Sequence, residues 1–144
     1  MAQGLFLESH NVISKRHAIL EDDERVAYLY LTRAGTQQPE RDVLAYSRIN
    51  PVDRVEWEAS KQTGGAPLLL EELASESAVV EKPAEREFSF KWSPDGTAVA
   101  LLRDDVPIAF ASAAERFGYS KAVVKASPLA NNWDQAKYEF TFPK

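Results

Sequence analysis

Histidine is the side chain whose proton exchange lies nearest neutral pH, and the chain contains two, His10 and His17. Glu8 precedes His10 by two residues and would share its face of an extended strand, because strand side chains alternate. His17 would join them only where the chain folds back on itself. These three residues define one candidate site, a small-ligand or hydrolytic pocket in which a carboxylate works with an imidazole. Their spacing matches no metal motif such as H-E-x-x-H, so we predict no metal and no cofactor.

The sequence lacks the motifs of nucleophilic catalysis and phosphate binding. The chain has no cysteine, which removes thiolate chemistry and disulfides. Ser120 is not framed by a G-x-S-x-G turn, and Gly64-Gly65 is not part of a phosphate-binding loop motif. The sequence therefore favours a non-enzymatic protein over an enzyme.

Aromatic side chains in polar surroundings give a second candidate site. Trp133 lies within the run Asn-Asn-Trp-Asp at residues 131–134, and Tyr119 lies between glycine and serine. Arg116 and Lys121 flank Tyr119, and aromatic residues next to basic ones are typical anchors of protein interfaces. We predict that Tyr119, Trp133, Arg116 and Lys121 form a recognition surface. The alternative is that Trp133 covers the core beneath a loop.

Charge and hydropathy restrict the partner and the location. The net charge of −5 disfavours a nucleic-acid partner, since such proteins usually carry a basic excess. The longest apolar runs, such as residues 98–102, are far shorter than the ~20 residues that span a bilayer, so no membrane partner is expected. Residues 1–9 lack the basic and then apolar pattern of a signal peptide. We predict a cytoplasmic protein that binds another protein, with a homodimer as a further possibility.

Alternating apolar residues predict strands over residues 25–33, 42–49, 88–92 and 97–102. Residues 12–20 are broken by polar side chains and predict two pieces or a bulged edge strand, and the acidic residues 21–24 predict a turn. The Ser-Pro-Asp-Gly run at 93–96 and the Arg-Asp-Asp run at 103–105 are turn sequences, so residues 87–110 form a three-stranded meander. Tyr138, Phe140 and Phe142 alternate and predict an inward-facing terminal strand over residues 137–142.

One helix and one long loop interrupt the strands. Pro51 and Asp53 suit a first helical turn, and Gly64-Gly65 ends the segment, so we predict a helix over residues 51–62. Its apolar face would be Val52, Val55 and Ala59, and Trp57 falls off that face. Residues 64–87 predict a loop-rich acidic excursion, with six glutamates against one lysine and one arginine between residues 68 and 87.

These elements predict one domain over residues 1–144. Its fold class is mainly β to α+β: a curved antiparallel sheet or a sandwich of six to eight strands, with one or two short helices. No repeat covers the chain, and neither half has enough strands to close a core alone.

The run Trp92-Ser93-Pro94-Asp95-Gly96, followed by Val99-Ala100, resembles the hairpin in each blade of TolB-like β-propellers. It occurs once, whereas a propeller repeats its blade at least four times, so the resemblance implies a hairpin only. Together with Gly118-Tyr119-Ser120 and Asn132-Trp133-Asp134, the run looks like a family of small uncharacterised bacterial proteins. That resemblance implies no activity.

The functional prediction is a non-enzymatic binding or interaction protein. An immunity-type protein that blocks a toxin fits the size, the acidity and the scarcity of catalytic residues. The alternative is the small-ligand or hydrolytic domain that uses His10, His17 and Glu8.

Overall fold

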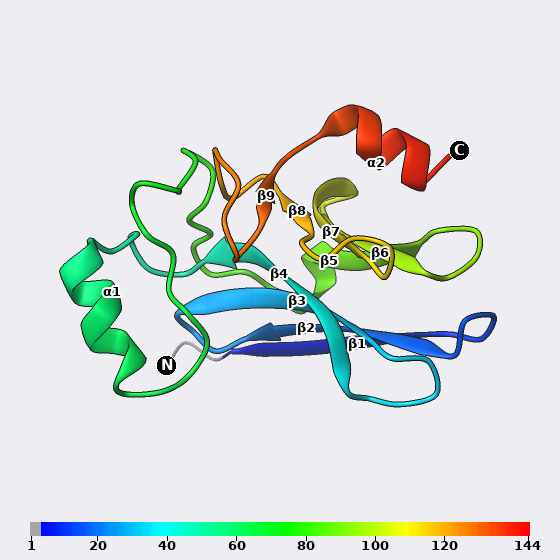
Figure 1. Ribbon diagram of the computed structural model, residues 1–144, viewed down its shortest axis with the longest axis horizontal. Coiled ribbons are helices and arrows are strands. Elements are labelled where there is room, and N and C mark those ends of the chain that lie inside the picture. The colour runs from blue at the N-terminus through cyan, green and yellow to red at the C-terminus, as the bar shows by residue number, and fades with distance from the viewer. Residues whose placement is uncertain (1–3) are drawn as a thin grey trace.

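The first sheet is formed by the N-terminal strands. The computed structural model describes residues 4–144, in which this sheet is antiparallel with the order β1-β2-β3-β4 (Figure 1). Its strands are β1 (Leu5–Asn11), β2 (Arg16–Asp22), β3 (Val26–Thr32) and β4 (Pro39–Ser47). The break predicted between residues 12 and 20 is the turn that joins β1 to β2. The turn predicted at residues 21–24 begins later, because Glu21 and Asp22 still belong to β2.

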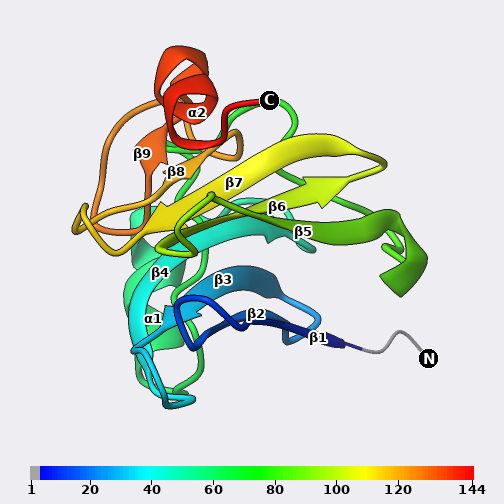
Figure 2. The ribbon, with the colours of Figure 1, turned by 90° about the vertical axis from the view of Figure 1, so that its right-hand side faces the viewer.

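The second sheet has the order β5-β6-β7-β8-β9. Its strands are β5 (Phe88–Trp92), β6 (Ala98–Arg103), β7 (Val106–Ser112), β8 (Tyr119–Ser120) and β9 (Asn131–Asn132). The pairs are antiparallel except for β8 and β9, which run parallel. Figure 2 shows the two sheets as two layers, with β7 of the second facing β3 and β4 of the first.

A single core fills the space between the layers. Alternation along each strand sends aliphatic side chains inward from both sheets. The fully buried members include Ala18, Leu20, Leu29, Leu31, Val43, Val99, Leu101, Ala109 and Ala111. Each leucine or valine of this set contributes roughly 1.5–3 kcal/mol by leaving water, so the core is the main source of stability.

The predicted mainly β fold with short helices is confirmed, in its sandwich form. The α-helices of the described residues are α1 (Arg54–Lys61) and α2 (Gln135–Thr141), with one 3-10 turn at Glu85–Glu87. Residues 4–144 contain nine strands, more than the six to eight predicted, because β8 and β9 are two residues long and carry little sequence signal. Among residues 4–144, neither helix has the length and apolar composition of a transmembrane span.

Helix α1 lies within the predicted range but begins three residues later, at Arg54, and presents a different face to the protein. The Asp53 carboxylate accepts a hydrogen bond of 2.7 Å from the backbone N–H of Glu56, which caps the first turn. The predicted apolar face is wrong, since Val55 is 79 % exposed. Trp57 packs against the core instead, and its Nε1 donates to the carbonyl of Leu68 at 2.9 Å. One large ring thus outweighs two small side chains in orienting this short helix.

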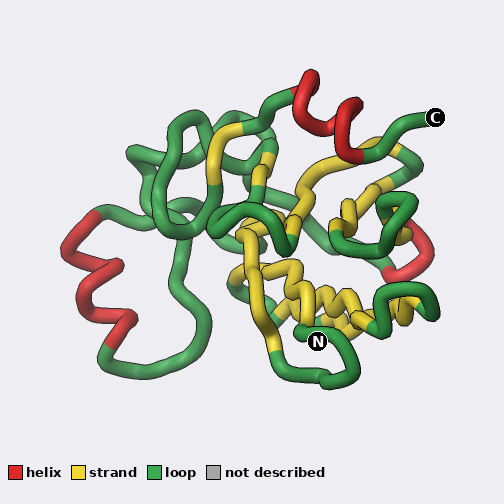
Figure 3. The backbone as a smooth tube through the Cα atoms, turned by 45° about the vertical axis from the view of Figure 1, so that its right-hand side comes forward, coloured by secondary structure: helices red, strands yellow, loops and turns green. Residues whose placement is uncertain are grey.

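The terminal strand predicted over residues 137–142 is wrong, because this segment is α2 (Figure 3). The Asp134 carboxylate accepts a 2.9 Å hydrogen bond from the backbone N–H of Lys137 and starts the helix. Tyr138 and Phe142 are four residues apart, so a helix places both on one face, against the second sheet. Phe140 points away from that face and is 85 % exposed.

The meander predicted over residues 87–110 is confirmed as β5, β6 and β7. Gly96 closes the first turn with φ of +74°, and Asp104 and Asp105 close the second with φ of +51° and +67°. Aspartate tolerates this left-handed region better than most residues. Pro107 lies at a register shift between β6 and β7, before β8 begins to pair, so its missing N–H interrupts no regular ladder.

Residues 64–84 form a loop between α1 and the 3-10 turn. Leu68, Leu69 and Leu70 are buried, and single bridges join the loop to neighbouring segments, as from Leu70 to Val52 and from Val79 to Ser47. The glutamates of the loop face water while its leucines reach the core. The predicted acidic, loop-rich segment is therefore an ordered loop that packs its leucines against the core of the sandwich.

Candidate functional site

The hairpin of β1 and β2 brings the predicted histidine and glutamate residues together. His10 lies directly opposite His17 in the register, with ring centroids 4.5 Å apart. The Nδ1 atom of His17 is 2.6 Å from Oε2 of Glu8, and Gln37 Nε2 donates to the same oxygen at 3.3 Å. The fold-back that sequence reasoning required does occur, and the three side chains form one cluster.

This cluster lies on the open outer face of the first sheet. Glu8 and His10 are exposed, whereas their neighbours Leu7 and Ser9 point to the other side of β1. Ser9 accepts a 3.0 Å hydrogen bond from Trp92 Nε1 across that other side, so its hydroxyl cannot meet the histidines. Within residues 4–144, no group of three or more histidine and carboxylate side chains could hold a metal ion. The close approach of His17 to Glu8 lacks hydrogen-bond geometry, since Nδ1 of His17 has no hydrogen-bond partner, so the cluster is a polar contact on the outer face of the sheet.

Three of the four residues of the predicted recognition surface meet beside α2. Tyr119 of β8 and Trp133, just after β9, both pack on Phe110, with ring centroids 4.8 Å and 5.6 Å away. Lys121 places Nζ 4.8 Å from the centroid of the Trp133 ring, and burial lowers the pKa of its ammonium group. Tyr138 of α2 completes the cluster, 5.4 Å from Trp133.

The polar atoms of this aromatic cluster are already engaged. Trp133 Nε1 donates to Gln135 Oε1 at 2.9 Å, and the Tyr119 hydroxyl donates to Glu115 Oε1 at 2.9 Å. Burial, followed by the Glu115 carboxylate, raises the pKa of Tyr119 to about 12. The rings are half-buried and fasten α2 to the second sheet, so the covering role weighed for Trp133 describes the packing better than a free surface does.

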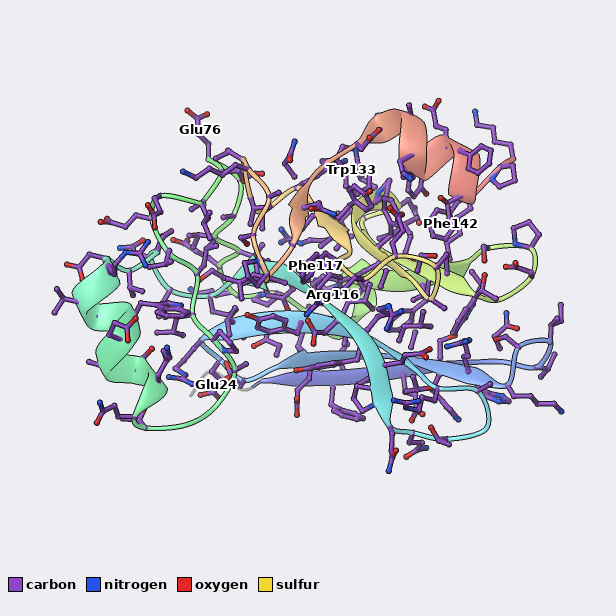
Figure 4. The ribbon with its side chains drawn as sticks, viewed as in Figure 1. Glu24, Glu76, Arg116, Phe117, Trp133 and Phe142 are labelled. Atoms are coloured by element: carbon purple, nitrogen blue, oxygen red, sulfur yellow. The ribbon has the colours of Figure 1, made fainter. Side chains whose placement is uncertain are left out.

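Arg116 lies apart from the other three residues. Its guanidinium stands 5.2 Å from the ring of the adjacent Phe117, and Figure 4 draws both away from Trp133. The loop that carries Arg116 is held by Arg41, which donates to the carbonyls of Glu115 at 2.8 Å and Ala113 at 3.0 Å. Arg116 therefore does not join Trp133 in one cluster.

A surface that sequence reasoning missed lies at one end of the sandwich. The β1–β2 turn, the β5–β6 turn and the C-terminal end of α2 gather on the right-hand side of Figure 1, and Figure 2 views this end directly. We call it the turn-end surface; its apolar members are Val12, Ile13, Pro94, Phe140 and Pro143. Val12, Ile13 and Phe140 are 73 %, 70 % and 85 % exposed.

The turn-end surface is continuous because the two turns touch and a groove joins the β5–β6 turn to the end of α2. A side chain at Gly96 would collide with Asn11 Oδ1 and lie 2.7 Å from Ser14 Oγ. A groove of about 470 Å³ runs from Pro94 to Phe140 and Pro143. The ion pair between Lys137 Nζ and Glu115 Oε1, 3.3 Å apart, lies in its wall.

Both turns are rigid. Asn11 Oδ1 accepts hydrogen bonds from the backbone N–H of Ile13 at 3.0 Å and of Ser14 at 2.9 Å. Asp95 accepts from the Thr97 N–H at 3.0 Å, from the Thr97 hydroxyl at 2.8 Å and from the Ser93 hydroxyl at 2.9 Å. These hydrogen bonds, led by that from the Thr97 N–H, hold the pKa of Asp95 below its ordinary value. The apolar side chains are thus presented in a fixed arrangement.

The sequence could have indicated only part of the turn-end surface. Val12 and Ile13 are two apolar residues between the turn formers Asn11 and Ser14, which is an unusual place for them. Phe140 could be recognised as exposed only once residues 135–141 were seen as a helix, because in a strand it would share a face with Tyr138.

A buried charged group was also missed. Asp22 is 3 % exposed and accepts a 2.6 Å hydrogen bond from the Tyr46 hydroxyl. Arg48 Nη1 lies 3.0 Å from each of its oxygens. Burial, followed by Asp22, raises the pKa of Tyr46 far above its ordinary value. This network ties β2 to the end of β4 and is structural.

No protein-family model, no curated protein and no solved structure matches this chain. The functional argument therefore depends on the surfaces described above.

Proposed function

We propose that this protein is a non-catalytic binding module that contacts a partner protein through the turn-end surface. The observation that carries the proposal is the exposure of Val12, Ile13 and Phe140 at one end of the molecule. The first two lie on the β1–β2 turn and Phe140 lies on α2, and the β5–β6 turn between them touches the first segment and shares a groove with the second. Large exposed apolar side chains gathered in one area are typical of protein-interaction sites, whereas scattered ones are ordinary.

A protein partner fits the shape of this surface better than a small molecule does. The groove is bordered by outward-pointing side chains from separate segments and is not closed around a ligand. The neighbouring polar groups are satisfied within the chain: Lys137 pairs with Glu115, and Asp95 accepts hydrogen bonds from its own turn. Such a surface offers contact area to a protein partner, and it has no converging set of reactive groups for a small molecule.

The energetic scale is adequate for specific binding. Each apolar side chain that a partner buries fully contributes roughly 1.5–3 kcal/mol. Rigid turns reduce the ordering cost that flexible loops would add on association. We therefore expect loss of Phe140 alone to weaken binding by about tenfold or more.

We further propose that the module works in the cytoplasm and acts by covering its partner, as an immunity-type protein covers a toxin. The absence of cysteine is compatible with a reducing compartment, and the net charge of −5 suits a basic partner. In this proposal the protein inhibits by occlusion and performs no chemistry.

Site-directed photo-crosslinking tests the proposal. A photoreactive amino acid replaces Phe140 in one variant and Val55 of α1 in the control; both native side chains are highly exposed, at 85 % and 79 %. We expect a defined protein adduct from position 140 in living cells and none from position 55. Co-purification of that partner should then fall in Phe140→Ser and Ile13→Ser and persist in Val55→Ser.

Two results would contradict this proposal. One is equal crosslinking from both positions, which indicates nonspecific contact. The other is undiminished co-purification of the partner with Phe140→Ser and Ile13→Ser, which would remove the turn-end surface from the interface.

A further inference from the structure

The outer edge of β1 carries backbone groups that point away from the protein. The His17 N–H donates to Thr32 Oγ1 at 2.8 Å, so the backbone of His17 is directed toward β3. His10, which lies opposite His17, is therefore in a non-hydrogen-bonded pair with it, and its own N–H and C=O point outward. Because the pattern repeats every second residue, the same holds for Phe6 and Glu8.

This edge lacks several of the features that usually prevent strand addition. β1 is the outermost strand of its sheet, and its register with β2 runs without a shift from Leu5–Asp22 to Asn11–Arg16. It contains no proline and no lysine. The opposite edge of the sheet differs: backbone bonds of 2.8 Å join Ser47 of β4 to Ala78 and Val80, so a segment of the same chain already occupies it. A regular, uncovered edge is a template for another strand.

We propose that the chain forms a symmetric homodimer in which β1 pairs antiparallel with β1 of a second copy, joining two four-stranded sheets into one of eight strands. This interface lies along the side of the first sheet and is independent of the partner proposed for the turn-end surface.

The side chains of β1 are self-complementary in such a pair. The outer face carries Phe6, Glu8 and His10 in order. A two-fold axis through Ser9 sets Glu8 opposite His10 of the second copy, once on each side of the axis. A two-fold axis through Glu8 would instead set two carboxylates opposite each other, which is unfavourable. Both contacts of Glu8 described above use Oε2, so Oε1 can accept from the imidazole of the second copy.

Phe6 adds an apolar contribution to the same interface. Its side chain is 60 % exposed in the single chain, although its backbone belongs to the regular ladder between β1 and β2. Pairing of β1 with a second copy extends the outer face of the sheet beside this ring and removes part of it from water. A second copy therefore satisfies the backbone edge, the charged pair and the exposed ring together.

Analytical ultracentrifugation over a wide range of protein concentration tests the dimer. We expect wild type to show a concentration-dependent dimer and Glu8→Pro to remain monomeric, because proline removes an outward N–H that no bond within the chain uses. Phe6→Lys should raise the dissociation constant about tenfold or more, since lysine on an edge opposes pairing. The controls Glu8→Gln, which keeps the N–H, and Val124→Lys, which replaces another exposed side chain, should still dimerise.

Hydrogen exchange provides a readout that does not depend on any variant folding. The amides of Phe6, Glu8 and His10 should exchange more slowly as the concentration of wild type rises, while the exposed amide of Val55 should not change. If the wild type stays monomeric at every concentration tested, the dimer proposal is overturned. The edge of β1 would then be available to a strand of another protein. A dimer that forms equally well in Glu8→Pro and Phe6→Lys would overturn it too. Either failure leaves the crosslinking test at Phe140 unaffected.

Discussion

Removal of the buried carboxylate of Asp22 should destabilise the protein strongly. Asp22 accepts from the Tyr46 hydroxyl at 2.6 Å and from Arg48 Nη1 at 3.0 Å, and only 3 % of the residue is exposed. In Asp22→Ala, the Tyr46 hydroxyl loses its acceptor and Arg48 loses this carboxylate in a region that water barely reaches. Breaking one side of a buried ion pair costs roughly 3–5 kcal/mol.

Tyr46→Phe separates the contributions within this network. That variant keeps the ion pair and the ring but loses one hydrogen bond to a charged acceptor, which is worth roughly 1.5–3 kcal/mol. We therefore expect the free energy of unfolding to fall in the order wild type, Tyr46→Phe, Asp22→Ala. Because domains of this size are stable by only about 5–15 kcal/mol, Asp22→Ala should lose a large fraction of the total.

Urea unfolding followed by tryptophan fluorescence measures these differences. With a typical dependence of ~1–3 kcal/mol per molar urea, Asp22→Ala should lower the midpoint by roughly 1–5 M. Glu21→Ala is the matched control, since the adjacent Glu21 is exposed and its loss should change stability by less than about 0.5 kcal/mol. A cost for Asp22→Ala no greater than that for Glu21→Ala would refute the assignment of Asp22 as a structural anchor.

Other variants test the helices and the first meander turn. Phe142→Ala should lower the free energy of unfolding by roughly 3–5 kcal/mol, whereas Phe140→Ala, at a mostly exposed position, should change it by less than about 0.5 kcal/mol; urea midpoints compare the two. Asp53→Ala removes the cap of α1 and should cost about 1 kcal/mol, with a small loss of helical circular dichroism; an unchanged spectrum and midpoint would argue against the cap. Asp95 has a lowered pKa in the folded state, so its stabilising effect is present above its unfolded pKa of about 3.9 and is lost as pH falls through the folded value. The destabilisation caused by Asp95→Ala should accordingly shrink between neutral pH and strongly acidic pH, and a constant difference would contradict this.

The strands were predictable wherever apolar residues alternate over several positions, because only one face of a strand can reach the core. This explains why β3, β5 and β6 lie where expected. The same reasoning failed for residues 137–142, since positions i and i+4 share a face in a strand and also in a helix. Only Phe140 distinguishes a strand from a helix here, because it is exposed in the helix and would face inward in the strand. The Asp134 cap that starts α2 is a local sequence signal of the helix, and the aromatic alternation obscured it.

The candidate sites show a similar limit. That His17 meets Glu8 and His10 follows from the length of the β1–β2 turn, which could not be known from spacing alone. Arg116 illustrates the reverse case, because three residues of separation from Tyr119 say little when the intervening chain is a loop held by Arg41. The buried position of Asp22 depends on Tyr46 and Arg48, which are more than twenty residues away in sequence.

The sequential order of the strands has a consequence for how the molecule folds. In both sheets, most ladders join a strand to the next strand along the chain, so each pairing closes only a short loop and loses little chain entropy. The first four strands and the β5–β7 meander can each pair locally before the two layers dock. The slow step should then be the docking of these two halves, whose sealing contacts involve residues distant in sequence. Substitutions that destabilise a single hairpin should then slow refolding, because the hairpin is already formed when the layers dock. Removal of contacts that are completed only after docking should mainly accelerate unfolding.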